Sequence, residues 1–202
     1  VVIGRMPAVA EATIRDLAQQ RGAPLTSVAE VYGDDLAAYP ETNLEGDYQR
    51  WNAATATLAA RVLGDRWRIT AATIEQGLRH VDWPGRWQRV TLGGRLAILD
   101  ASHNPEGAEV LDSNLQHLFA ETRRAPIVVT GALGAIRAKP LLETIARHAR
   151  EIHLVVPHQA RACSQEELEA LIPPTFRGRV IRSAVQTLFP VPACVRRVGR
   201  RM

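Results

Sequence analysis

Cysteine and long apolar runs are both scarce in this sequence. Its 202 residues include only two cysteines, Cys163 and Cys194, without metal-ligand spacing, which excludes a disulfide-stapled secreted domain and fits a reducing compartment. No apolar run approaches the roughly 18 to 20 residues that a membrane span requires. Apolar residues make up 46% and charged residues 23%, as in ordinary folded proteins. We therefore expect a soluble cytoplasmic protein that does not contact a membrane.

Acidic residues are missing from the end of the chain. The last 26 residues hold seven arginines and no Asp or Glu, whereas residues 1–176 hold 18 Lys and Arg against 21 Asp and Glu. The formal net charge of +4 therefore belongs to the tail, and the body is mildly acidic. Because the tail lacks interleaved aromatic side chains suited to base stacking, we expect no nucleic-acid partner.

Lysine is almost absent, since the chain has 24 arginines and a single lysine. This bias indicates GC-rich coding DNA, in which a shifted reading frame yields stretches rich in Arg, Pro, Val and Ala. Residues 177–202 have that composition, so we interpret them as a basic tail that is either out of frame or divergent. The chain also begins at Val1 with a strand-like VVIG, which favours a truncated chain.

Hydrophobic periodicity changes part-way along the chain. The first part is mostly helical, with strands predicted at 1–3 and 27–32 and helices at 8–20, 47–63 and 70–81. The second part alternates, with strands predicted at 87–92, 96–99, 127–130 and 153–156 and helices at 105–119, 140–149 and 164–171. Strands separated by helices favour an α/β domain with a parallel sheet, beginning near residues 84–86.

The segment LAILDASHNPEGAEVL has the form of a ligand loop. Its strand delivers Asp100 to the carboxyl end, where open α/β sheets bind ligands, and Asn104 and Pro105 can begin the next helix. A carboxylate there can accept hydrogen bonds from a ribose diol, and His103 can face a phosphate or acyl phosphate. Alternatively, Asp100 and Asn104 only tie the turn and His103 is a surface residue.

Two further segments are weaker candidates. In Trp83-Pro84-Gly85-Arg86, a rigid turn holds an arginine whose planar fork suits a phosphate, although most arginines are solvated surface residues. In GDYQRWN, Asn52 lies near the start of a helix and could serve adenine recognition or an interhelical hydrogen bond.

In this order and spacing, GDYQRWNAATA, WPGRWQRV and LDASHNPEGA resemble the ATP-binding elements of folylpolyglutamate synthases and dihydrofolate synthases, in the Mur ligase superfamily. The resemblance extends from about Val1 to about Pro174. It implies that residues 1–84 are the end of a central ATPase domain and that residues 85–176 form a Rossmann-like parallel-sheet C-terminal domain. Residues 177–202 are the tail, and the fold is expected to be incomplete at both ends.

The resemblance also implies residue roles and an activity. Asn52 matches an adenine-side asparagine, Arg86 a phosphate-binding arginine, Asp100 the ribose aspartate and His103 a catalytic histidine of the same loop. The family uses ATP and Mg²⁺ to phosphorylate a carboxylate of folate or dihydropteroate, and the amine of L-glutamate then attacks the acyl phosphate. The full-length protein is expected to be a monomer.

Three departures from the family pattern stand out. After about residue 176 the family would continue with further strands, which residues 177–202 do not resemble. No G-x-x-x-x-G-K-[ST] phosphate loop occurs, and the family's metal ligands are expected upstream, so we expect the isolated chain to be inactive. After residues 127–130 the family usually has Asp-Lys-Asp, whereas this chain has GALGAIRAKP. Arg137 or Lys139 could replace that lysine.

Two alternatives stay open at this point. A peptidoglycan-precursor Mur ligase would share the fold and the ATP geometry, but the chain lacks an Asp-Asn-Pro-Arg-like clamp for the amino acid. A non-catalytic α/β remnant would keep the fold and weak nucleotide affinity.

Overall fold

The computed structural model describes residues 1–188, apart from the side chain of Asp65. Contacts divide the chain into two compact units, one from Val1 to Ala101 and one from Ser102 onward. This division falls after the strands of residues 88–99, whereas the boundary taken from the family resemblance falls before them. The boundary at residues 84/85 therefore remains a prediction.

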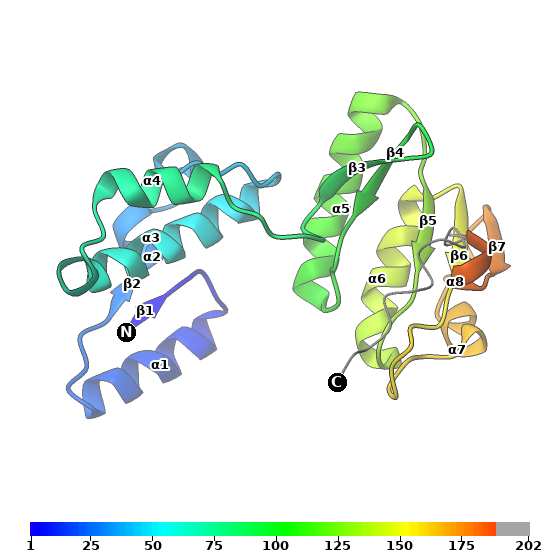
Figure 1. The fold of residues 1–202 in the computed structure, drawn as a ribbon. Coiled ribbons are helices and arrows are strands. Elements are labelled where there is room, and N and C mark those ends of the chain that lie inside the picture. Colours follow the sequence, from blue (N-terminus) through cyan, green and yellow to red (C-terminus); the bar gives the residue numbers. More distant parts are fainter. Residues whose placement is uncertain (189–202) are drawn as a thin grey trace, which may run out of the picture. The chain divides into compact units, whose positions relative to one another are not determined.

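The first unit is mostly helical around a short parallel strand pair (Figure 1). Its elements are β1 (Val2–Ile3), α1 (Ala8–Gln20), β2 (Thr26–Ser27), α2 (Val28–Tyr32), a 3-10 turn (Leu36–Ala38), α3 (Asp47–Trp67), α4 (Ala71–Arg79), β3 (Gln88–Leu92) and β4 (Arg95–Leu99). Strands β1 and β2 pair in parallel. A buried cluster of Val28, Tyr39, Ala54 and Leu58 joins α2 to α3.

The strand predicted at 27–32 is wrong beyond Ser27, because β2 covers only Thr26–Ser27 and Val28–Tyr32 forms helix α2. Val28 and Tyr32 are four residues apart, so a helix turns both toward the same side, and both pack in the cluster with Ala54. Burial of this pair, with Val28 fully buried, outweighs the strand preference of a short Val- and Tyr-containing segment.

Helix α3 also differs from expectation, because it continues past Gly64 to Trp67. Its cap is Arg68, in the left-handed region at φ 54°. The β3–β4 hairpin, by contrast, follows its prediction. The strands pair antiparallel around Gly93 and Gly94, whose φ values of 56° and 75° suit the tight turn that links them.

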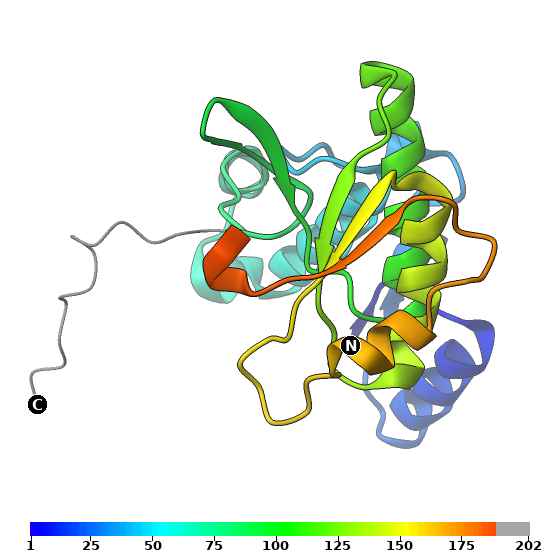
Figure 2. The same cartoon turned by 90° about the vertical axis from the view of Figure 1, so that its right-hand side faces the viewer.

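The second unit contains a parallel sheet in the order β5-β6-β7. Figure 2 shows the strands side by side with α5 and α6 on one face. Its elements are α5 (Pro105–Thr122), β5 (Ile127–Thr130), α6 (Ala135–His148), β6 (Glu151–Leu154), α7 (Gln165–Ala170), β7 (Arg179–Arg182) and α8 (Val185–Leu188). The predicted α/β class with a parallel sheet is confirmed.

The alternation of β6 explains the core of this unit. Ile152 and Leu154 are fully buried and pack with Leu142 and Ile145 of α6. Successive side chains of a strand point to opposite faces, so His153 lies on the face away from this core. Burial of several aliphatic side chains, each contributing roughly 1.5–3 kcal/mol, holds α6 on the sheet.

Three boundaries in this unit are corrected. Helix α6 begins at Ala135, before the predicted 140, because fully buried Ala138 extends its packed face toward the N-terminus. Strand β6 (Glu151–Leu154) begins and ends two residues before the predicted strand at 153–156. Strand β7 lies within the segment interpreted as tail, because Val180 packs on the core and the strand pairs with β6. Helix α8 also lies in that segment, and residues 189–202 lie outside the described residues.

Candidate functional site

The turn that carries Arg86 is fixed at several points. Gly85 has φ +76°, a left-handed conformation that favours glycine. Its N–H donates to Gln88 Oε1 at 3.1 Å, and its carbonyl accepts from the Ala101 N–H at 2.8 Å. These bonds hold the backbone of Arg86 near Ala101, two residues after the end of β4.

Asp100 ties the same turn through its side chain. Its Oδ2 accepts a hydrogen bond from the Trp87 N–H at 3.1 Å. Trp87 is 6% exposed and has φ +49°, an uncommon conformation for a bulky residue. Asp100 thus performs the turn-tying role that the sequence left open, and it brings the two predicted residues Arg86 and Asp100 into one region.

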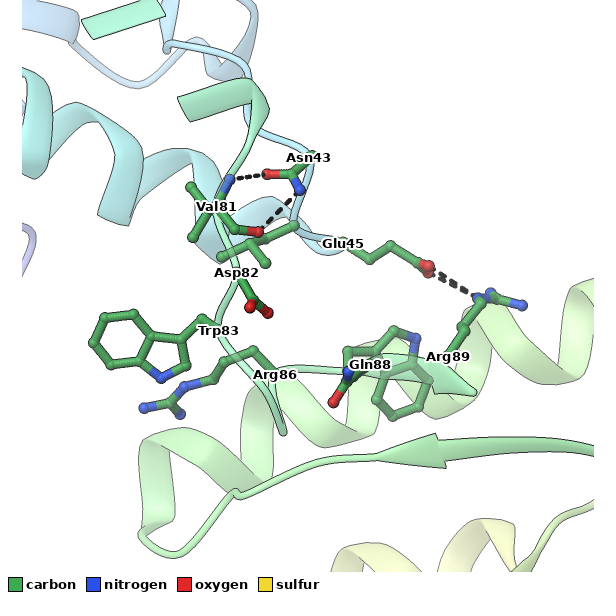
Figure 3. A pocket seen from close by; sticks show the side chains of 10 residues that line it. Asn43, Glu45, Val81, Asp82, Trp83, Arg86, Gln88 and Arg89 are labelled. Carbon is green, nitrogen blue, oxygen red and sulfur yellow. Dashed lines mark hydrogen bonds and ion pairs between the residues drawn. The ribbon is translucent and has the colours of Figure 1, made fainter. Parts of the chain in front are cut away.

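Arg86 itself is half-buried, and its guanidinium has no hydrogen-bond or ion-pair partner within residues 1–188. Figure 3 shows its side chain extending to the same side of the turn as the indole of Trp83, which is 61% exposed. An arginine that is partly desolvated and unpaired suits an anionic ligand, because its planar fork can donate two parallel hydrogen bonds to phosphate oxygens.

A cavity of about 240 Å³ adjoins this arginine (Figure 3). Across it, both carboxylate oxygens of Glu45 lie 3.0 Å from Arg89 Nε. Asn43 Nδ2 donates to the Val81 carbonyl at 3.0 Å, and the Val81 N–H donates back to Asn43 Oδ1 at 3.0 Å. Sequence reasoning missed Asn43, Glu45 and Arg89, because their partners lie 38 and 44 residues away.

Asn52 lies on the exposed side of α3, near its start. Its Nδ2 donates to Oε1 of Gln49 at 3.1 Å, and Gln49 is only 3% exposed. This contact lies within one helix, and among residues 1–188 Asn52 makes no interhelical side-chain hydrogen bond. A buried glutamine that accepts from one amide hydrogen orients the exposed carboxamide of Asn52.

In the second unit, His103 is exposed in the loop before α5. The predicted helix start is confirmed, because Asn104 Oδ1 accepts from the Gly107 N–H at 2.9 Å and Pro105 is the first helical residue. A Cβ on Gly107 would lie 2.8 Å from Asn104 Oδ1. This close approach requires glycine, a requirement that the sequence alone did not reveal.

The loop after β5 carries neither basic candidate, because Arg137 and Lys139 are both exposed residues of α6. Residues two apart on a helix point in different directions, so at most one of them can face a given ligand. Within the described part of the chain, no group of three or more His, Cys, Asp or Glu side chains could hold a metal ion. No helix in residues 1–188 is long and apolar enough to cross a membrane.

Comparison with known proteins confirms the predicted resemblance. The chain is 33% identical over 135 residues to the folylpolyglutamate synthase of Lacticaseibacillus casei. The aligned stretch covers 65% of this chain and 30% of that protein. No protein-family model matches the chain. The similarity therefore rests on individual relatives that are much longer than these 202 residues.

Solved structures of folylpolyglutamate synthases share the fold of this chain. Mycobacterium tuberculosis folylpolyglutamate synthase complexed with ADP and AMPPCP superposes with a TM-score of 0.70 at 20% identity, covering 92% of this chain and 46% of that one. A bifunctional folylpolyglutamate synthase/dihydrofolate synthase with Mn, AMPPNP and L-glutamate bound superposes with a TM-score of 0.63 at 25% identity. The match covers 92% of this chain and 45% of that one. The chain thus spans less than half the length of these relatives.

Proposed function

We propose that these residues belong to an ATP-dependent ligase that joins L-glutamate to folate or dihydropteroate. Support comes from 33% identity to a folylpolyglutamate synthase and from a shared fold with structures that hold ATP analogues and L-glutamate. The proposal assigns residues 1–84 to the end of a central ATP-binding domain and residues 85–176 to the C-terminal domain. It places the complete enzyme in the cytoplasm as a monomer.

One observation carries the nucleotide assignment. Arg86 is half-buried and unpaired within the described residues, in a turn that Gly85 and Asp100 immobilise. An unpaired guanidinium on a rigid support loses little conformational entropy when it binds an anion. A phosphate of ATP is the anion that the proposed reaction supplies.

The remaining roles follow the family pattern. Asp100 accepts hydrogen bonds from the ribose hydroxyls while its Oδ2 holds the Trp87 N–H. Asn52, oriented by Gln49, presents its carboxamide to adenine. His103 donates a hydrogen bond toward a phosphate or acyl phosphate, where added charge stabilisation favours transfer.

The proposed reaction has two steps. A carboxylate oxygen of the acceptor attacks the γ-phosphorus of ATP, the bond to the β-phosphate oxygen breaks, and ADP leaves with an acyl phosphate formed. The amine of L-glutamate then attacks the acyl carbon, phosphate leaves with the original carboxylate oxygen, and an amide remains. Arg86 and His103 act by binding and positioning the phosphates. Positioning and charge stabilisation account for most of the rate enhancement of such transfers.

The described residues do not supply every part of this chemistry. No phosphate loop occurs in the 202 residues, and no acidic cluster within residues 1–188 fits a metal. ATP reactions use a divalent metal to neutralise phosphate charge, and a relative holds Mn. We assign the metal ligands and the phosphate loop to a segment outside this chain, so that the isolated chain binds nucleotide but does not turn over.

An isotope-transfer experiment tests the mechanism. Folate labelled with ¹⁸O in the reacting carboxylate is incubated with ATP, L-glutamate and the longer polypeptide that contains this chain. An acyl phosphate requires that one ¹⁸O per amide formed appears in inorganic phosphate. Amide formation with unlabelled phosphate would contradict the acyl-phosphate step, and a longer polypeptide that binds adenine nucleotide but forms no amide would favour the non-catalytic remnant.

A further inference from the structure

A second polar cluster lies in the second unit, on the sheet face opposite α6. His153 Nδ1 lies 2.8 Å from the hydroxyl oxygen of Ser183, and His153 Nε2 lies 2.8 Å from Oε1 of Glu151. Arg179 Nη1 lies 3.2 Å from the other oxygen, Oε2, of the same glutamate. A serine, a histidine and a carboxylate therefore form one continuous chain of hydrogen bonds.

The carboxylate fixes which imidazole nitrogen carries the proton. The hydrogen bond from His153, assisted by the charge of Arg179, lowers the pKa of Glu151, so this group is ionised at neutral pH. An ionised carboxylate only accepts hydrogen bonds, so His153 Nε2 must carry the proton. In the neutral ring, Nδ1 is then an acceptor, and the Ser183 hydroxyl donates to it. This is the arrangement of a nucleophile with its general base.

The backbone holds the serine in place. The Ser183 N–H donates to the Leu154 carbonyl at 2.9 Å, and the Ser183 carbonyl accepts from Gln165 Nε2 at 2.8 Å. Ser183 immediately follows β7, at the carboxyl end of the sheet where open α/β folds bind ligands. The side chains of His153 and Glu151 are 14% and 15% exposed, so the base and its partner are also restrained.

We propose that Ser183 is a nucleophile activated by His153, and that this centre cleaves small activated carboxylic esters. Ser183 Oγ forms a bond to the ester carbonyl carbon while its proton moves to His153 Nδ1. The bond from that carbon to the alcohol oxygen then breaks, and the alcohol leaves with the proton. Water cleaves the acyl-serine, releasing the acid and restoring the hydroxyl. Glu151 is a positioning residue that keeps the proton on Nε2.

Covalent labelling tests the nucleophile directly. A fluorophosphonate forms an Oγ–P bond with an activated serine and releases fluoride. We expect the folded chain to be labelled at Ser183, and we expect Ser183→Ala to remove the label. Ser113 is an exposed serine of α5 that has no histidine partner among residues 1–188, so Ser113→Ala should leave labelling unchanged. A folded chain that takes no label, or one that is labelled equally after Ser183→Ala, would overturn the proposal.

Hydrolysis of p-nitrophenyl acetate tests the other two residues. His153→Gln should lower the Ser183-dependent rate at least about a hundredfold, since general-base catalysis contributes about 10²–10⁴. Glu151→Gln should lower kcat at least about tenfold with KM unchanged, because only the base is misoriented, and circular dichroism should show an unchanged fold. Equal rates for wild type and a folded His153→Gln variant would contradict the assignment of the base.

Discussion

The Trp87 N–H donates a hydrogen bond of 3.1 Å to Oδ2 of Asp100, 13 residues further along the chain. This bond connects the turn of Arg86 to the end of strand β4. Two residues with separate proposed roles, one on phosphate and one on ribose, are therefore mechanically coupled. We therefore expect a change at Asp100 to alter the position of Arg86 as well as its own contact.

This coupling predicts different results for two substitutions at Asp100. Asp100→Ala removes the acceptor and leaves the N–H of buried Trp87 unsatisfied, which costs about 1–3 kcal/mol. Asp100→Asn keeps an acceptor oxygen, so it should lower the unfolding free energy by less than about half as much as Asp100→Ala. Urea unfolding of both variants measures the difference. Equal destabilisation would show that the Trp87 bond does not hold the turn.

Arg86→Ala should weaken nucleotide binding without unfolding the chain. A charge-assisted hydrogen bond contributes about 1.5–3 kcal/mol, so the dissociation constant of ATP should rise about 10- to 100-fold. Titration calorimetry on the chain measures this change. Arg95, an exposed residue of β4, provides the matched control, and Arg95→Ala should leave the constant unchanged. Equal affinity of the Arg86→Ala variant and the wild-type chain for ATP would contradict the proposal that Arg86 binds a phosphate.

Sequence reasoning succeeded where the physical cause is local. The turn at Gly93 and Gly94 and the cap at Asn104 each depend on residues within a few positions of one another. The prediction for residues 28–32 was wrong because their helix is stabilised by burial against Ala54. Ala54 is more than twenty residues away in the sequence, so the local pattern does not reveal this contact.

The same limit applies to the site. The positions of Arg86 and Asp100 were predictable, since a rigid turn and a strand end are both visible in the sequence. The Glu45–Arg89 pair was not, because it joins segments 44 residues apart. The Ser183–His153 contact lay partly in a segment interpreted as tail, whose strand becomes evident only through its pairing with β6.

Two glycine substitutions should have opposite effects on stability. Gly107→Ala places a Cβ 2.8 Å from Asn104 Oδ1 and disrupts the cap of α5, at a cost of about 0.5–2 kcal/mol. Gly77 lies in α4, where a Cβ meets nothing within 4 Å. Gly77→Ala should therefore stabilise the chain by up to about 1 kcal/mol. Thermal unfolding of both variants tests the pair, and destabilisation by both would contradict the local explanation.

Stability should decrease in acid partly through Asp112. Its Oδ1 lies 2.7 Å from His148 Nε2 and 2.9 Å from Arg147 Nη2. The hydrogen bond from His148, together with Arg147, lowers the pKa of Asp112 in the folded state. A lowered pKa means that the ionised form favours folding, so the contribution is complete above the unfolded value, near pH 4, and is lost as the pH falls through the folded value.

The Asp112→Asn variant isolates this contribution. The difference in unfolding free energy between wild type and variant should be largest at neutral pH and should shrink below about pH 4, where the wild-type carboxyl becomes protonated. Urea unfolding at a series of pH values measures it. A difference that is the same at pH 7 and pH 3 would show that the pairing of Asp112 does not stabilise the fold.

The most direct test of the proposed ligase function is an ATP-dependent ligation assay on the longer polypeptide that contains this chain. It is run with radiolabelled L-glutamate and with either dihydropteroate or tetrahydrofolate, and ADP release is measured in parallel. We expect one glutamate joined per ADP released with at least one of the two acceptors, and loss of both signals in the Arg86→Ala variant. Absence of glutamate-dependent ADP release with either acceptor would contradict the proposed function.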